Sequence, residues 1–115
     1  MKIITMCCIL TLCVSCTTMK TRIIQNEGSS WTPNEMANVQ AGNIAIGMTK
    51  SQVMAATGIP DSLIDKRVHI TTMGRSESWF IYKNMFGGWT FANSGMDMLV
   101  LIGFDDHSRV NYIGN

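Results

Sequence analysis

Residues 46–60, IGMTKSQVMAATGIP, contain the clearest helix signals in the chain. Thr49 and Gln52 have the spacing of a capping box, in which each side chain bonds to the backbone of the other residue at the start of a helix. Gly58 suits the left-handed backbone that ends many helices, and Pro60 cannot continue one. The segment therefore predicts a helix of barely two turns. Such a short helix is marginal alone, so it must bury one side against the rest of the chain.

The residues upstream of this helix extend the pattern. We expect Gly47 to allow a positive φ or a close backbone approach, and Met48 to pack on Val53 across the cap. Residues 32–35, TPNE, supply a second capping hydroxyl, a proline at the first helical position and a glutamate three residues after the cap. This signal predicts an earlier helix that runs to about Gln40.

The sequence after Asp61 has the alternation of β-strands. In one such run Val68 and Ile70 share a face, and Arg67 and His69 share the other. Glycines and polar turn residues separate the runs. The predicted strands are residues 67–72, 77–83, 98–104 and 110–113, with a turn at 74–75. We therefore expect an α+β fold in which two short helices pack on one face of a three- to four-stranded antiparallel meander.

The first sixteen residues have the pattern of a targeting signal. A lysine precedes the apolar run IITMCCILTLCV, residues 3–14, which is shorter than the about 20 residues of a membrane-spanning helix. Residues 13–16, CVSC, resemble the lipobox of bacterial lipoproteins, although Cys13 stands where leucine is usual. The resemblance implies that residues 1–15 are a signal peptide and that Cys16 is acylated after cleavage. An ordinary secretory signal with an incidental cysteine is the alternative.

The lipoprotein resemblance also implies a location. Because Thr17 follows the cysteine where aspartate would signal retention, the resemblance implies an outer-membrane anchor that faces the periplasm. Residues 16–30 are mostly polar and are predicted to be a flexible tether, although Ile23 and Ile24 could dock on the domain. Residues 31–115 are then the folded domain.

Several motifs occur in order between residues 32 and 113. A G-M-T-x-x-x-V segment is followed by G-x-P, by a strand with tryptophan and tyrosine at 79–82, and by an apolar strand that runs into FDDHSRV at 104–110. This order resembles the BamE (SmpA/OmlA) family of small outer-membrane lipoproteins. Residues 65–74 look like an insertion relative to its shortest members, and Ser108 lies where a glycine is usual. The motif residues in this chain are Gly47, Met48, Thr49, Val53, Gly58 and Pro60.

The family resemblance implies a fold and a role. The fold is an ααβββ arrangement shared with β-lactamase-inhibitor proteins. The role is non-catalytic support of the machinery that inserts β-barrels into the outer membrane. From this resemblance we expect a lipid-anchored periplasmic adaptor that acts through protein contacts in outer-membrane protein assembly or envelope integrity. An inhibitor of a periplasmic enzyme, or a phospholipid- or peptidoglycan-binding module, is the alternative.

The sheet and the loop FGGWTF, residues 86–91, are the candidate interaction surface. The predicted strands carry apolar residues on both faces, and two short helices can cover only one. Three large aromatic rings around two glycines are suited to anchoring a partner protein or a lipid. The candidate residues are therefore Trp79, Phe86, Trp89 and Phe91. The alternative is that these rings fold back over the sheet as additional core.

Composition and residue placement argue against several other functions. Nine Lys and Arg against eight Asp and Glu give a formal net charge of +1, which argues against a strongly basic nucleic-acid binder. All four cysteines lie within residues 7–16, so no disulfide or thiolate site is expected after Thr17. The cluster at 105–107, DDH, is predicted to be a solvated hairpin turn. No catalytic residue, metal site or cofactor is predicted.

Overall fold

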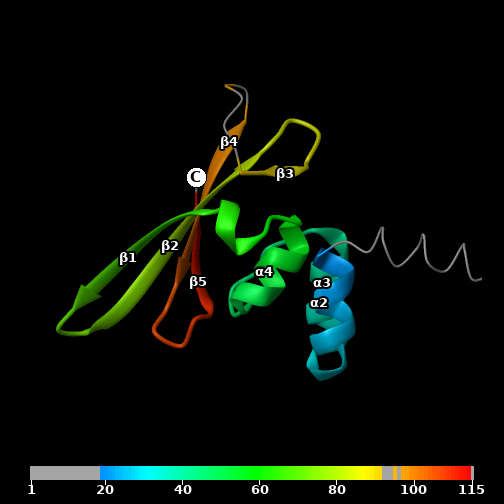
Figure 1. Cartoon of the computed structure of the whole chain (residues 1–115), viewed down its shortest axis with the longest axis horizontal. Helices are drawn as coiled ribbons and strands as arrows, with labels where there is room; N and C mark the ends of the chain where they lie inside the picture. The colour runs from blue at the N-terminus through cyan, green and yellow to red at the C-terminus, as the bar shows by residue number, and fades with distance from the viewer. Residues whose placement is uncertain (1–18, 92–94, 96, 115) are drawn as a thin grey trace, which may run out of the picture.

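The computed structural model of the chain describes residues 19–91, 95 and 97–114. Helices come first in this part of the chain, and an antiparallel sheet follows (Figure 1). The α+β class predicted from the sequence is therefore confirmed. The helices are α2 (Met19–Glu27), α3 (Pro33–Ala41) and α4 (Lys50–Thr57), with short 3-10 turns η1 (Gly28–Ser30) and η2 (Asp61–Leu63). The strands are β1 (Asp65–Thr71), β2 (Gly74–Lys83), β3 (Trp89–Thr90), β4 (Met98–Phe104) and β5 (Val110–Gly114).

The two predicted capping boxes are both present. In α4 the Gln52 backbone N–H donates to Thr49 Oγ1 at 3.2 Å, and the Thr49 N–H donates to Gln52 Oε1 at 2.9 Å. Thr32 and Glu35 make the equivalent pair of bonds at the start of α3. Gly58 ends α4 with a φ of 74°, in the left-handed region that the sequence predicted.

A hydrogen bond joins the two capping boxes. The Gln52 side-chain amide donates to Glu35 Oε2 at 3.0 Å, so each of these residues caps its own helix and also links α3 to α4. The backbone N–H of Thr32 and the amide of Gln52 stabilise the charged carboxylate, and the pKa of Glu35 lies below its ordinary value. The same two side chains that cap the helices, Glu35 and Gln52, therefore also hold α3 and α4 in their relative position.

The residues predicted to be a tether form a helix over most of that range. The expected tether spanned residues 16–30, but Met19–Glu27 are α2, and Ile23 and Ile24 pack against the core. Gly28 is buried, and a Cβ placed there would lie 2.7 Å from Met36 Cε. The flexible-tether prediction is wrong for residues 19–30, because packing against the neighbouring helices overrides a weak local signal.

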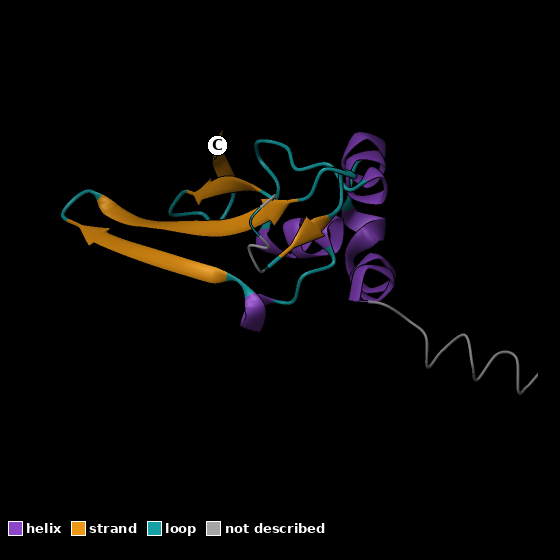
Figure 2. Ribbon diagram, turned by 90° about the horizontal axis from the view of Figure 1, so that it is seen from above, coloured by secondary structure: helices purple, strands orange, loops and turns teal. Residues whose placement is uncertain are grey.

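The sheet order is β1-β2-β4-β5, and β3 pairs with the end of β2. Gly74 pairs with Thr71 and has a φ of 133°, so the first hairpin turns at residues 72–73 and not at the predicted 74–75. The β1–β2 hairpin extends beyond the rest of the sheet (Figure 2). At its tip Ile70 is 80% exposed and Met73 is 95% exposed.

One face of the sheet and the inner sides of the helices form the hydrophobic core. Trp79 and Phe104 meet at its centre, with ring centroids 4.6 Å apart. The core also includes Val39, Met48, Val53, Ala55, Ile59, Ile64, Ile81, Val100, Ile102 and Val110. The motif residues Met48 and Val53 are therefore structural, as expected. Gly47 has a φ of 90°, which explains the need for glycine before the cap.

The predicted signal peptide, residues 1–15, and the predicted lipidated Cys16 lie outside the described residues. Among the helices that the structure describes, none is long and apolar enough to cross a membrane.

Candidate interaction surface

The strands present a second apolar face on the side away from the helices. We call this the open face and define it by Phe80, Tyr82, Leu99, Leu101 and Tyr112. Phe80 lies directly opposite Leu101, and Tyr82 lies opposite Leu99, so two cross-strand apolar pairs form its centre. Leu99 is 38% exposed and Tyr112 is 54% exposed. The described part of the chain thus leaves large apolar side chains accessible on this face.

Trp79 does not lie on an accessible surface, which corrects its prediction as an interaction residue. It faces the helices and is 0% exposed. Its indole N–H donates to Glu77 Oε2 at 2.6 Å. Alternation along the strand places Trp79 and Phe80 on opposite faces, but the sequence does not show which face the helices cover.

Asn84 shapes the loop that follows β2, and sequence reasoning missed this residue. Its side-chain oxygen accepts from the backbone N–H groups of Phe86, at 3.0 Å, and Gly88, at 2.9 Å. Gly87 between them has a φ of 85°. An asparagine that accepts from the backbone two residues later is a recognised turn signal, so this residue could have been found.

The aromatic residues of this loop are divided between the surface and the fold. Phe86 is 89% exposed and Phe91 is 50% exposed, while the neighbouring Met85 is 65% exposed. Trp89 instead folds back, and its indole N–H donates to the carbonyl oxygen of Gly42 at 2.7 Å. Phe86 and Phe91 are therefore accessible, as the interaction prediction requires. Trp89 instead follows the alternative, in which the ring folds back onto the domain.

A groove of about 630 Å³ lies beside this loop. Its lining combines apolar side chains with one cation, Lys83, whose Nζ lies 5.1 Å from the centre of the Trp89 ring. The other lining residues include Ile44, Met85, Met98, Val100 and Ile113. These residues come from segments far apart in the chain, so no local pattern in the sequence indicated the groove.

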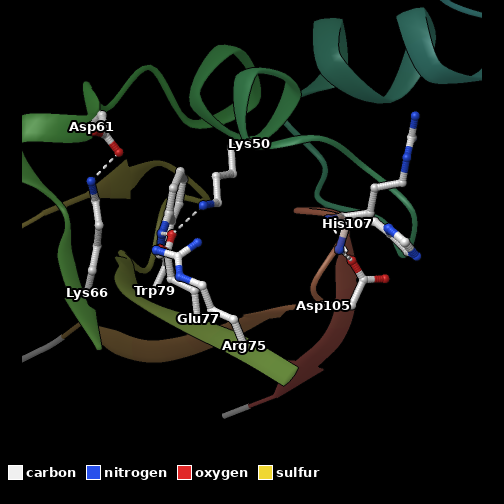
Figure 3. Close-up of polar contacts among 9 residues, drawn as sticks. Lys50, Asp61, Lys66, Arg75, Glu77, Trp79, Asp105 and His107 are labelled. Atoms are coloured by element: carbon white, nitrogen blue, oxygen red, sulfur yellow. Dashed lines mark hydrogen bonds and ion pairs between the residues drawn. The ribbon is translucent and has the colours of Figure 1, made fainter. Parts of the chain in front are cut away.

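The buried carboxylate of Glu77 connects α4 to β2 on the covered side (Figure 3). Lys50 Nζ lies 2.8 Å from Oε2, and an Arg75 guanidinium nitrogen lies 3.2 Å from Oε1. Burial raises the pKa of Glu77, but the bonds from Lys50 and the Trp79 indole, together with both positive charges, outweigh it, so the pKa lies below its ordinary value. The cluster holds the first turn of α4 against the sheet.

The turn at 105–107 contacts its own backbone. Asp105 Oδ1 accepts from the N–H groups of Arg109, at 3.0 Å, and His107, at 2.9 Å, and these bonds lower the pKa of Asp105. Asp106 and His107 are exposed, in agreement with a solvated hairpin turn. Ser108 has a φ of 61°, which explains why a glycine would suit this position. Within the described residues no group of three or more His, Cys, Asp or Glu could hold a metal ion.

Comparison with known proteins leaves the family assignment as a prediction. No protein-family model, no curated protein and no solved structure matches this chain.

Proposed function

We propose that this protein is a lipid-anchored adaptor on the periplasmic side of the outer membrane. It acts without catalysis, through protein contacts, in outer-membrane protein assembly or envelope integrity. The observation that carries the proposal is the open face, where Phe80, Leu101 and Tyr112 lie on the side of the sheet away from the described helices α2, α3 and α4. Accessible apolar side chains grouped on one surface are typical of protein interaction sites.

The leader supports the anchored part of the proposal. The short apolar run and the CVSC sequence at 13–16 resemble a lipoprotein signal. Two acyl chains are sufficient to hold a domain stably on a membrane. Mass spectrometry of the mature protein purified from membranes is expected to find the chain beginning at an acylated Cys16. A free thiol at Cys16 would contradict the anchor.

Site-specific crosslinking in intact cells tests the adaptor role. A photo-crosslinking amino acid replaces Tyr112 on the open face, and in a matched control it replaces Gln25, which is exposed on α2. We expect an envelope protein of the β-barrel assembly machinery to be captured from position 112 and not from position 25. Mass spectrometry of the crosslinked bands identifies the partner.

Other outcomes of the same experiment contradict the adaptor role. Capture of a single hydrolase, whose activity falls on binding, would indicate an inhibitor instead. Crosslinks only to phospholipid or peptidoglycan would indicate a lipid- or wall-binding module. Equal capture from both positions would show that the open face has no special role.

A further inference from the structure

The chain enters the domain close to the predicted anchor. Met19 is the first described residue and begins α2, three residues after Cys16. Three successive Cα–Cα steps span at most about 11 Å, whatever conformation the intervening residues adopt. An acylated Cys16 would therefore hold the Cα of Met19, at the start of α2, within about 11 Å of its own Cα.

The start of α2 lies at the C-terminal end of α3. Lys20 Nζ donates to the carbonyl oxygen of Gln40 at 3.3 Å. Two residues further on, the carbonyl oxygen of Gly42 accepts the indole N–H of Trp89 at 2.7 Å. These two hydrogen bonds bring the chain entry and the loop after β2 to the same end of α3. In Figure 1 both lie away from the tip of the β1–β2 hairpin.

The loop at this end has the chemistry of a membrane contact. Met85 and Phe86 are 65% and 89% exposed, and the side chain of Asn84 holds the backbone that presents Phe86. Residues 83–91, KNMFGGWTF, contain no acidic side chain, and the first turn of α2 is also without one. The apolar side chains of Met85 and Phe86 thus follow a cation, Lys83, in the sequence, and Lys20 lies in the first turn of α2. Apolar side chains that are accompanied by cations and not by carboxylates suit the boundary between lipid headgroups and acyl chains.

We propose that Met85 and Phe86 insert into the lipid leaflet that holds the anchor, so that the membrane contacts the domain at two places. The inference rests on the acylation of Cys16 proposed above. Two contacts restrict the orientation of the domain, and the tip of the β1–β2 hairpin, which lies away from both of them, is directed away from the membrane.

Spin labelling of the full-length mature lipoprotein in phospholipid vesicles tests this orientation. The other three cysteines lie within residues 1–15, which the signal cleavage removes, and the Cys16 thiol is acylated. Phe86→Cys therefore supplies the single reactive thiol for a nitroxide. Ile70→Cys is the matched control, because Ile70 is also apolar and is 80% exposed on the distant hairpin.

The readout is the ratio of nitroxide collisions with oxygen, which concentrates in lipid, to collisions with a water-soluble nickel chelate. We expect this ratio to be several-fold higher at position 86 than at position 70. Equal, water-like ratios at both positions on an acylated protein would overturn the inference while leaving the anchor intact. Low collision rates with both reagents at position 86 would also overturn it, because they indicate a protein contact.

Mass spectrometry of the same sample separates failure of the inference from failure of the proposed function. An unmodified Cys16 on a protein that does not bind the vesicles would overturn both. Thermal unfolding of the two labelled variants should match that of the unsubstituted protein, since both positions are largely exposed.

Discussion

Strands β2, β4 and β5 carry apolar side chains on both faces, and the two faces have different environments. On the covered face Trp79, Ile81 and Ile102 are each 0% exposed. On the open face Leu99 and Tyr112 are 38% and 54% exposed. The two faces have similar chemistry, so hydrophobicity alone does not decide burial. The position of the helices decides which face is buried. The same strands therefore supply core residues on one face and accessible residues on the other.

The largest difference between the faces is expected at two neighbouring residues. Trp79→Ala should lower the free energy of unfolding by about 3–5 kcal/mol, because it leaves a cavity beside Phe104. Phe80→Ala, on the open face, should lower it by about 1 kcal/mol, since its ring is only partly buried. Urea unfolding followed by circular dichroism measures both. Equal effects would mean that the two faces are equally buried.

Glu77→Gln tests the polar edge of the covered face. The amide keeps an acceptor for the Trp79 indole but loses the ion pairs with Lys50 and Arg75. We expect a loss of about 2 kcal/mol at pH 7, less than for a fully buried pair because both cations are partly exposed.

The pH dependence of this loss follows from the lowered pKa of Glu77. Its stabilisation is fully present above the ordinary glutamate pKa of about 4.3 and is lost as the pH falls through the lower folded value. The stability difference between the natural protein and Glu77→Gln should therefore shrink on acidification. Urea unfolding at pH 7 and at successively lower pH measures it, and a constant difference would contradict the assignment.

Gly58→Ala tests the end of the helix that covers the sheet. A Cβ at Gly58 would meet no atom within 4 Å, so any cost comes from the left-handed backbone, with a φ of 74°. We expect a loss of about 1 kcal/mol. Gly58→Asn should lose less, because asparagine tolerates this conformation better. Thermal unfolding ranks the two variants, and the reverse order would be unexpected.

The smallest effect on stability is expected at the open face. Leu99→Ser should change the free energy of unfolding by about 0.5 kcal/mol or less, as is usual at an exposed position. It should nevertheless reduce the partner captured by a crosslinker at position 112. Unchanged capture from a stably folded variant would count against the open face as the contact surface.

Local rules predicted the helix ends and part of the sheet. Thr49 with Gln52 and Thr32 with Glu35 form capping boxes as expected, and the strand predicted at 98–104 has those bounds in the structure. Capping bonds join residues three positions apart, so a short sequence contains all the groups involved. The same rules did not predict α2, because Ile23 and Ile24 form only a weak pattern until α3 and α4 supply a surface.

The candidate surface was predicted in part. The loop at 86–91 was identified from its aromatic content, and Phe86 and Phe91 are accessible as expected. Trp79 was assigned to the wrong face, since strand alternation separates two faces without ranking them. Asn84 was overlooked, although its turn chemistry is visible in the sequence.

The amino-acid order is sufficient to specify the helix caps, the alternation of the strands and the left-handed glycines, because the atoms that satisfy each of these lie within a few residues of one another. Burial of Trp79, folding of residues 19–27 and the bond from Trp89 to Gly42, 47 residues away, required the assembled domain. All three depend on surfaces that form only when segments distant in the sequence pack together. The free energy gained by removing apolar area from water is available only in that packed state.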